Sequence, residues 1–214
     1  MRAWTRAVVG VMVQGVLLFM AGSALASAAC PSDERIPTAA SAADAARALV
    51  CDINVIRGRH DLGPVRWNDT VAQPAQSFAE ELAVRHEISH TSTDGRAPKD
   101  RVFATGYFDG FAAWLVLENV EWGSSVYATP LATAVGWMQS TEHRANLLDP
   151  QAQEIGVGVA QGELADHPGS GTFYVADFAA RGDTIKSART TRKRRTCTTR
   201  KRHDLRRKRC RRRL

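Results

Sequence analysis

Five polar residues, spread over three distant segments, carry side chains of the types used in binding and catalytic sites. They are His90, the pair Glu118 and Asn119, and a later pair, Ser140 and His143. An imidazole can bind a metal or carry a proton near neutral pH, and a carboxylate that accepts its hydrogen bond fixes its tautomer. We therefore predict that these residues converge on one cleft.

The two histidines of this set suggest a metal site. His90 and His143 could together bind Zn²⁺ or another divalent cation, with Glu118 as a third ligand or as an orienting hydrogen-bond partner, and with water completing the coordination sphere. Two histidines and at most one carboxylate make an open site. Without a metal, the same side chains would line a polar cleft for a ligand or a partner.

Hydrolysis is the alternative chemistry. Ser140, His143 and Glu118 have the residue types of a nucleophile, a base and an orienting acid. The spacing of three places Ser140 and His143 on one face of the predicted helix. However, the chain has no G-x-S-x-G elbow and no H-E-x-x-H sequence. A serine inside a helix also has its neighbouring backbone amides committed, so we expect Ser140 to be a hydrogen-bonding residue on the helix face.

The elements that position these residues follow from the spacing of apolar side chains. Helices are predicted over residues 42–59, from a cap at Asn68 or Asp69 to near His86, over 98–105, and from Thr129 to Leu148. Residues 155–160 and 172–178 alternate as strands of a hairpin, whereas 65–67 is a short apolar link and 107–122 is aromatic and apolar. Helices flanking a small antiparallel sheet give a single α+β domain. Three large aromatic side chains are expected to anchor its core: Trp67, Trp137 and Phe178.

The run from Trp137 to Pro150, followed by the segment 154–159 and preceded by His90 and the pair Glu118–Asn119, resembles the CAP superfamily in its bacterial extracellular form. This superfamily comprises cysteine-rich secretory proteins, antigen 5 and pathogenesis-related 1 proteins, and the resemblance covers residues 40–181. It implies a three-layer α-β-α sandwich.

The same resemblance assigns His90 and His143 to the two histidines of the family's cleft and Glu118 to its first acid. Ser140 stands where the second acid falls, as in many bacterial members. Leu117 replaces the glycine that usually precedes the Glu-Asn pair, which departs from the close backbone approach expected at that point.

Residues 1–26 have the organisation of a secretory signal peptide, with Arg2 and Arg6 before an apolar stretch at 7–20 and a cleavage sequence at Ala24–Ala26. The apolar stretch is short for a bilayer span of about 20 residues, which favours cleavage over a transmembrane anchor. A lipoprotein anchored at Cys30 is less favoured, because no leucine stands three residues before it. We expect a secreted or envelope-associated protein.

Export permits disulfides, and four cysteines allow three pairings. Proximity in sequence favours Cys30 with Cys51 and Cys197 with Cys210. The first bridge would join the extended lead, residues 27–39, to the first helix and could contribute about 3 kcal/mol. Free thiols are disfavoured in an oxidising compartment, and a four-cysteine zinc site would need a C-x-x-C spacing that the chain lacks.

Charge divides the chain into an acidic body and a basic tail, 182–214. From Lys186 to Leu214 there are 16 lysines and arginines and one acid, Asp204, whereas residues 27–185 hold 11 basic and 21 acidic residues. Such a tail cannot bury a core, so we expect disorder and adhesion to anionic cell-wall polymers or lipids. A solvated charge run without a partner is the alternative. No aromatic residue is present to stack on bases, which argues against a specific nucleic-acid module.

Together these features predict a secreted binding protein rather than an enzyme. Its site would take a ligand or partner, with or without a divalent metal, and its tail would hold it near the envelope. Extracellular hydrolysis of peptide or envelope substrates by His143 and Glu118 is the second hypothesis, and disturbance of membranes by the tail alone is the third.

Overall fold

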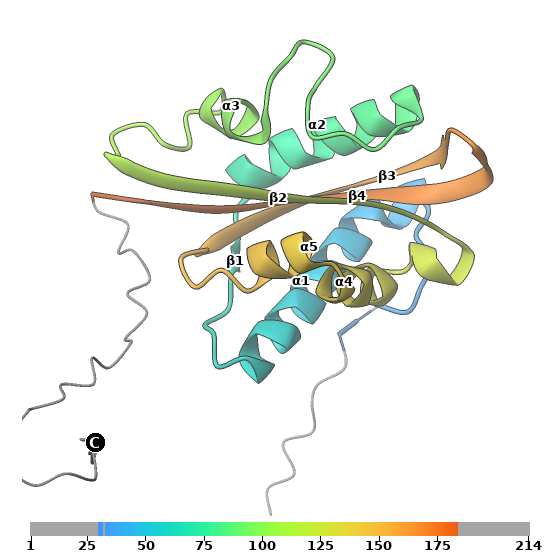
Figure 1. Ribbon diagram of the computed structural model, residues 1–214, viewed down its shortest axis with the longest axis horizontal. Helices are drawn as coiled ribbons and strands as arrows, with labels where there is room; N and C mark the ends of the chain where they lie inside the picture. Colours follow the sequence, from blue (N-terminus) through green and yellow to red (C-terminus); the bar gives the residue numbers. More distant parts are fainter. Residues whose placement is uncertain (1–29, 32, 184–214) are drawn as a thin grey trace, which may run out of the picture.

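The computed structural model describes residues 30, 31 and 33–183; the predicted signal peptide, Cys197, Cys210 and the basic run from Lys186 lie outside the described residues. Four strands form one sheet in the order β1-β3-β4-β2 (Figure 1). Their bounds are β1 Arg66–Trp67, β2 Ala113–Ser124, β3 Glu154–Leu164 and β4 His167–Gly182. Strands β3 and β4 form the predicted antiparallel hairpin. Strand β2 arises in the segment that the sequence marked only as aromatic and apolar, and it pairs with β4 in antiparallel, whereas β1 pairs with β3 in parallel. The sheet is therefore mixed, and the expected apolar link at 65–67 is a short strand.

Helices cover both faces of this sheet and confirm the three-layer α-β-α arrangement. One face carries α2 (Asp69–Arg85) and α3 (Pro98–Phe103), and the other carries α1 (Ala42–Arg59), α4 (Pro130–Gln139) and α5 (Thr141–Leu147) (Figure 1). Short 3-10 helices at Ala39–Ser41 and Ser125–Ala128 precede α1 and α4. The predicted helix at 42–59 and the Asn68 cap of α2 are confirmed, since the Asn68 side chain accepts hydrogen bonds from Thr70 and Val71.

Alternation along the strands sends successive side chains into two separate cores. Phe178 packs with the fully buried Trp137 between the sheet and the α1–α4 layer, whereas Phe173 packs with Phe78 beneath α2. Trp67 is only partly buried at the margin of the first core. The expected aromatic anchors thus hold for Trp137 and Phe178 and only in part for Trp67.

Helix α2 lies unusually close to β3 because two β3 residues have no side chain. A Cβ at Gly156 would lie 2.1 Å from the backbone nitrogen of Ala72, and one at Gly158 would lie 2.2 Å from the carbonyl oxygen of Ala75. These glycines let the helix backbone rest directly on the sheet. The contact thereby fixes the distance of α2 from the sheet, and with it the position of the following loop, which carries His90.

The single helix predicted from Thr129 to Leu148 is wrong, because the chain leaves helical geometry at Ser140. This residue is extended, with φ −87° and ψ 129°, and its Oγ accepts a hydrogen bond from the backbone nitrogen of His143 at 3.5 Å. Serine is a favoured N-cap because its side chain satisfies an amide at the start of a helix. Ser140 therefore ends α4 and begins α5, and it does not share a continuous helix face with His143.

A disulfide joins Cys30 to Cys51, with the two Cα atoms 5.7 Å apart, as the spacing of the cysteines predicted. It fastens the segment before the 3-10 helix Ala39–Ser41 to the middle of α1. The second predicted pair lies outside the described residues. Within the described part of the chain, no helix combines the length and apolar character needed to cross a bilayer.

Candidate functional site

Glu118 is a buried carboxylate in the middle of the edge strand β2, and only 7% of the residue is exposed. Its Oε1 lies 2.7 Å from Nδ1 of His90, and its Oε2 accepts a hydrogen bond from Nη2 of Arg101. The predicted contact between Glu118 and an imidazole is thus present. Because an ionised carboxylate can only accept, Nδ1 of His90 carries the proton.

His90 extends from the loop after α2, and 54% of its side chain is exposed. The hydrogen bond to Glu118 is the main influence on its pKa, which it raises above the usual value, while partial burial acts in the opposite direction. With Nδ1 held by Glu118, Nε2 is the ring nitrogen that remains for a ligand.

Arg101, which the sequence analysis missed, holds both the carboxylate and the loop. The residue is 4% exposed, and its Nη1 donates to the carbonyl oxygens of His90 at 3.2 Å and Arg96 at 3.1 Å and to Oγ of Ser92 at 3.2 Å. The guanidinium also stacks 3.6 Å above the ring centre of Phe78. Arginine suits this position because its planar fork can bond several acceptors at once.

Asp177 is a second buried acid beside Glu118, its partner across the β2–β4 pair. It is fully buried, and neither of its oxygens has a hydrogen-bond partner among the described residues. Burial, and next the charge of Glu118, raise the pKa of Asp177 well above its usual value. Burial therefore favours the neutral, protonated form of Asp177 beside Glu118.

Two asparagines fix α5 against the same edge strand from the opposite face. Nδ2 of the fully buried Asn119 donates to the carbonyl oxygen of His143 at 3.0 Å. Nδ2 of Asn146 in turn donates to the carbonyl oxygen of Glu118 at 3.1 Å and to Oδ1 of Asn119 at 2.9 Å. These bonds set the position of His143 relative to Glu118. Both partners of Asn146 thus lie on β2.

His143 and His90 approach the edge of β2 from opposite faces of the sheet. Burial, followed by the charge of His90, lowers the pKa of His143 below its usual value. His90 therefore takes a proton more readily than His143, which is expected to be neutral at pH 7. We call His90, Glu118, Asn119 and His143 the edge-strand site.

The catalytic arrangement expected for a serine hydrolase is not assembled here. Oγ of Ser140 accepts a hydrogen bond from the backbone nitrogen of His143 and not from its ring. The side chain of Glu118 bonds His90 and Arg101, and within the described part of the chain it forms no hydrogen bond with the ring of His143. Among residues 30–31 and 33–183, the edge-strand site also forms no cluster of three metal-ligand atoms within 4.8 Å of one another; one such cluster exists, at Cys30, Asp33 and Asp52.

A family model described as "CAP: Cysteine-rich secretory protein family" matches residues 51–178, which include every residue of the edge-strand site. The chain belongs to this family. Its match lies within the boundaries 40–181 predicted from the sequence.

Three similar proteins come from Bacillus species. The chain is 32% identical over 106 residues to the "Uncharacterized membrane protein YlbC" and 26% identical over 125 residues to the "Uncharacterized protein YkwD", both of Bacillus subtilis strain 168; the matches cover 50% and 58% of this chain. They cover 29% and 43% of those relatives, so the chain spans less than half of their length. A crystal structure of an extracellular protein with an SCP domain from Bacillus anthracis strain Ames aligns with a TM-score of 0.52 at 26% identity, over 64% of this chain and 40% of that one.

These likenesses establish the α+β fold of the CAP family for this chain. The B. anthracis protein is described as extracellular and YlbC as a membrane protein. A shared fold hosts different functions, so the function has to be argued from the edge-strand site itself.

Proposed function

We propose that this CAP domain is a non-enzymatic binding domain and that its ligand binds at the edge-strand site. The observation that carries the proposal is the Arg101–Glu118–His90 chain of contacts, in which a buried ion pair orients a half-exposed imidazole. Holding a histidine by its Nδ1 restricts the motion of its ring and requires charge to be buried. It is a recurrent means of presenting Nε2 to a ligand or a metal.

The two histidines would supply only part of the coordination sphere of a divalent cation such as Zn²⁺. His90 would offer Nε2 and His143 one ring nitrogen, while Glu118 would act as the orienting partner of His90 rather than as a ligand. The cation would thus keep open positions, and it would supply a Lewis-acid anchor for an anionic or carbonyl group of the bound ligand. The lowered pKa of His143 favours the neutral, ligating form.

Hydrolysis of peptide or envelope substrates remains the second hypothesis, and the geometry favours it less. Ser140 caps α5 through its Oγ, and among the described residues it forms no hydrogen bond with an imidazole that could remove its proton. A His143→Ala variant tests the choice, because a hydrolase would lose turnover whereas a binding domain would lose only its ligand.

The test of the proposal is a calorimetric titration of Zn²⁺ into the purified chain. We expect one ion to bind and binding to be lost in His90→Ala and in His143→Ala. His60→Ala is the matched control, because His60 is exposed at the end of α1 and far from β2 in sequence. Absence of binding, or binding that neither site variant weakens, would overturn the metal-assisted form of the proposal and leave only a metal-free site.

We further propose that the chain is secreted and that its basic segment adheres to anionic envelope components. The support is the concentration of 16 lysines and arginines between Lys186 and Leu214. Deleting residues 186–214 should abolish sedimentation with anionic lipid vesicles, and neutral vesicles serve as the control. Equal sedimentation of the full and truncated chains would contradict this role for the segment.

A further inference from the structure

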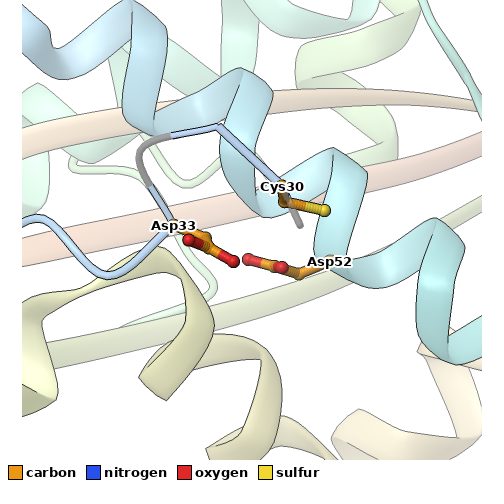
Figure 2. Close-up of side chains that lie close together, drawn as sticks. All are labelled: Cys30, Asp33 and Asp52. Atoms are coloured by element: carbon orange, nitrogen blue, oxygen red, sulfur yellow. The ribbon is translucent and has the colours of Figure 1, made fainter. Parts of the chain in front are cut away.

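Two carboxylates face each other on the side of the molecule where the N-terminal lead crosses α1. Asp33 comes from the lead and Asp52 from α1, and their side chains point toward one another beside Cys30 (Figure 2). One ligand atom from each of these three residues lies within 4.8 Å of the others. This cluster lies where the lead meets α1 and shares no residue with the edge-strand site.

Asp52 is not an ordinary surface acid. The residue is only 5% exposed, and its Oδ2 has no hydrogen-bond partner among the described residues. Neither carboxylate forms an ion pair with a basic side chain in the described part of the chain. The pKa of Asp52 is shifted by its burial and by Asp33. A buried anion beside a second anion is costly unless a positive charge or a proton offsets it.

The backbone holds the pair in place. The disulfide ties Cys30 to Cys51, the residue before Asp52. The carbonyl oxygen of Asp33 also accepts a hydrogen bond at 3.0 Å from the backbone nitrogen of Leu131 at the start of α4. The lead is thus fastened at Cys30 and at Asp33 itself, and the two carboxylates cannot separate easily. A preorganised pair of this kind is what a weak ligand needs, because little ordering is left to be done on binding.

We propose that Asp33 and Asp52 form a binding site for a hard divalent cation of the Ca²⁺ or Mg²⁺ class. The donors are carboxylate oxygens, which such cations prefer, and the Cys30 sulfur is in a disulfide and offers no thiolate. Asp33 is partly exposed, so water can complete the coordination sphere. The bound ion bridges the lead to α1 and removes the repulsion between the two acids.

Protons compete with the cation for the same oxygens. Burial, and then the charge of Asp33, raise the pKa of Asp52 to about 7. The other titratable group that interacts with Asp52 from a neighbouring element is Tyr174 of β4, whose pKa burial and the charges of Asp52 and Glu121 raise. Tyr174 stays neutral, so the occupancy of the site is set by Asp33 and Asp52 and increases as the pH rises above about 7.

The experiment is thermal unfolding of the oxidised full chain at pH 8, in chelator, in CaCl₂ and in MgCl₂, at matched ionic strength. We expect either ion to raise the Tm of the wild-type chain, with half of the effect at about 10⁻⁴ to 10⁻³ M, as for weak sites completed by water. Asp52→Asn and Asp33→Asn should abolish the rise. Asp44→Asn, which removes an exposed acid from the same helix, should retain it.

The outcomes separate a cation from a proton. Should Asp52→Asn fail to fold, Asp33→Asn on the partly exposed lead still decides the matter. A wild-type Tm that is insensitive to both ions at pH 8 would overturn the proposal, because protons alone would then offset the charges of the two acids. An ion effect of equal size in all variants would also overturn it. A His90→Ala and His143→Ala double variant should keep the full Ca²⁺ effect, so the test is independent of the edge-strand site.

Discussion

Glu118 connects every part of the edge-strand site, because its two oxygens hold His90 and Arg101 while its backbone carbonyl holds Asn146. Its negative charge therefore decides the protonation of the imidazole beside it. Burial favours the neutral form of the neighbouring Asp177, which disfavours a second negative charge beside Glu118.

Replacing Glu118 with glutamine should lower the pKa of His90. The isosteric amide keeps the shape of the side chain but removes the charge that stabilises the imidazolium. Histidine NMR signals followed over a pH titration report this value directly. Glu142→Gln is the control, because Glu142 has only a minor influence on His90, and a shift equal to that of Glu118→Gln would contradict the assignment.

Arg101 should matter for stability more than its place in a short, charged helix suggests. Arg101→Met would leave the buried Glu118 without its ion-pair partner, and loss of one member of a buried pair typically costs about 3–5 kcal/mol. Urea unfolding measures this loss. Arg96→Met removes an exposed arginine from the loop before α3 and should change the unfolding free energy by less than about 0.5 kcal/mol. Similar losses in both variants would show that Arg101 does not hold Glu118.

Sequence alone was informative at this scale only where residue type and family pattern coincided. His90, Glu118 and His143 could be found because they match positions of a known pattern. Arg101 could not, since its neighbours Lys99 and Asp100 make it look like one more surface charge. Asp177 could have been predicted as a buried acid, because it lies within the otherwise apolar segment Phe173–Phe178.

Among the elements, the turn at Ser140 changes the chemistry most. Apolar periodicity runs through residues 130–148. Its one glycine, Gly136, lies four residues before the break and no proline lies beside Ser140, so the pattern does not mark the break. Serine is tolerated inside helices and favoured at their start, and tertiary contacts decide between the two. Strand β1 was not predicted for another reason: two residues are too few to show an alternating pattern.

The packing of α2 on β3 predicts a sharp contrast between two glycine substitutions. Gly156→Ala places a Cβ against the backbone of Ala72 and should destabilise the chain by about 1–3 kcal/mol or more, because neither backbone can yield easily. Gly63→Ala meets nothing within 4 Å and should be neutral or slightly stabilising. Denaturant unfolding of both variants checks this, and equal stability would contradict the close contact of α2 with the sheet.

For the whole molecule, buried acids should make the folded state more stable in mild acid than at pH 8. Burial raises the pKa values of Asp52 and Glu121 to about 7 each, whereas acids in the unfolded chain titrate near about 4. Between these values the folded state binds more protons, so the unfolding free energy falls as the pH rises and levels off above about 7. His90 acts in the same direction, since its contribution is lost as the pH rises through its raised pKa, and His143 acts in the opposite direction.

Urea unfolding at several pH values between 5 and 8, in chelator, measures this dependence. The Asp52→Asn, Glu121→Gln double variant should flatten the curve because its amides do not titrate. A wild-type unfolding free energy that rises from pH 5 to pH 8 would contradict the account of these buried acids.

The central claim is that His90 and His143, 53 positions apart in sequence, serve one site at the edge of β2. The most direct measurement is the NMR spectrum of the histidine rings during a Zn²⁺ titration. We predict that the signals of His90 and His143 change together and saturate at one equivalent of zinc, while those of His60, His86 and His167 stay unchanged. Signals that respond separately, or a response confined to other histidines, would contradict a shared site.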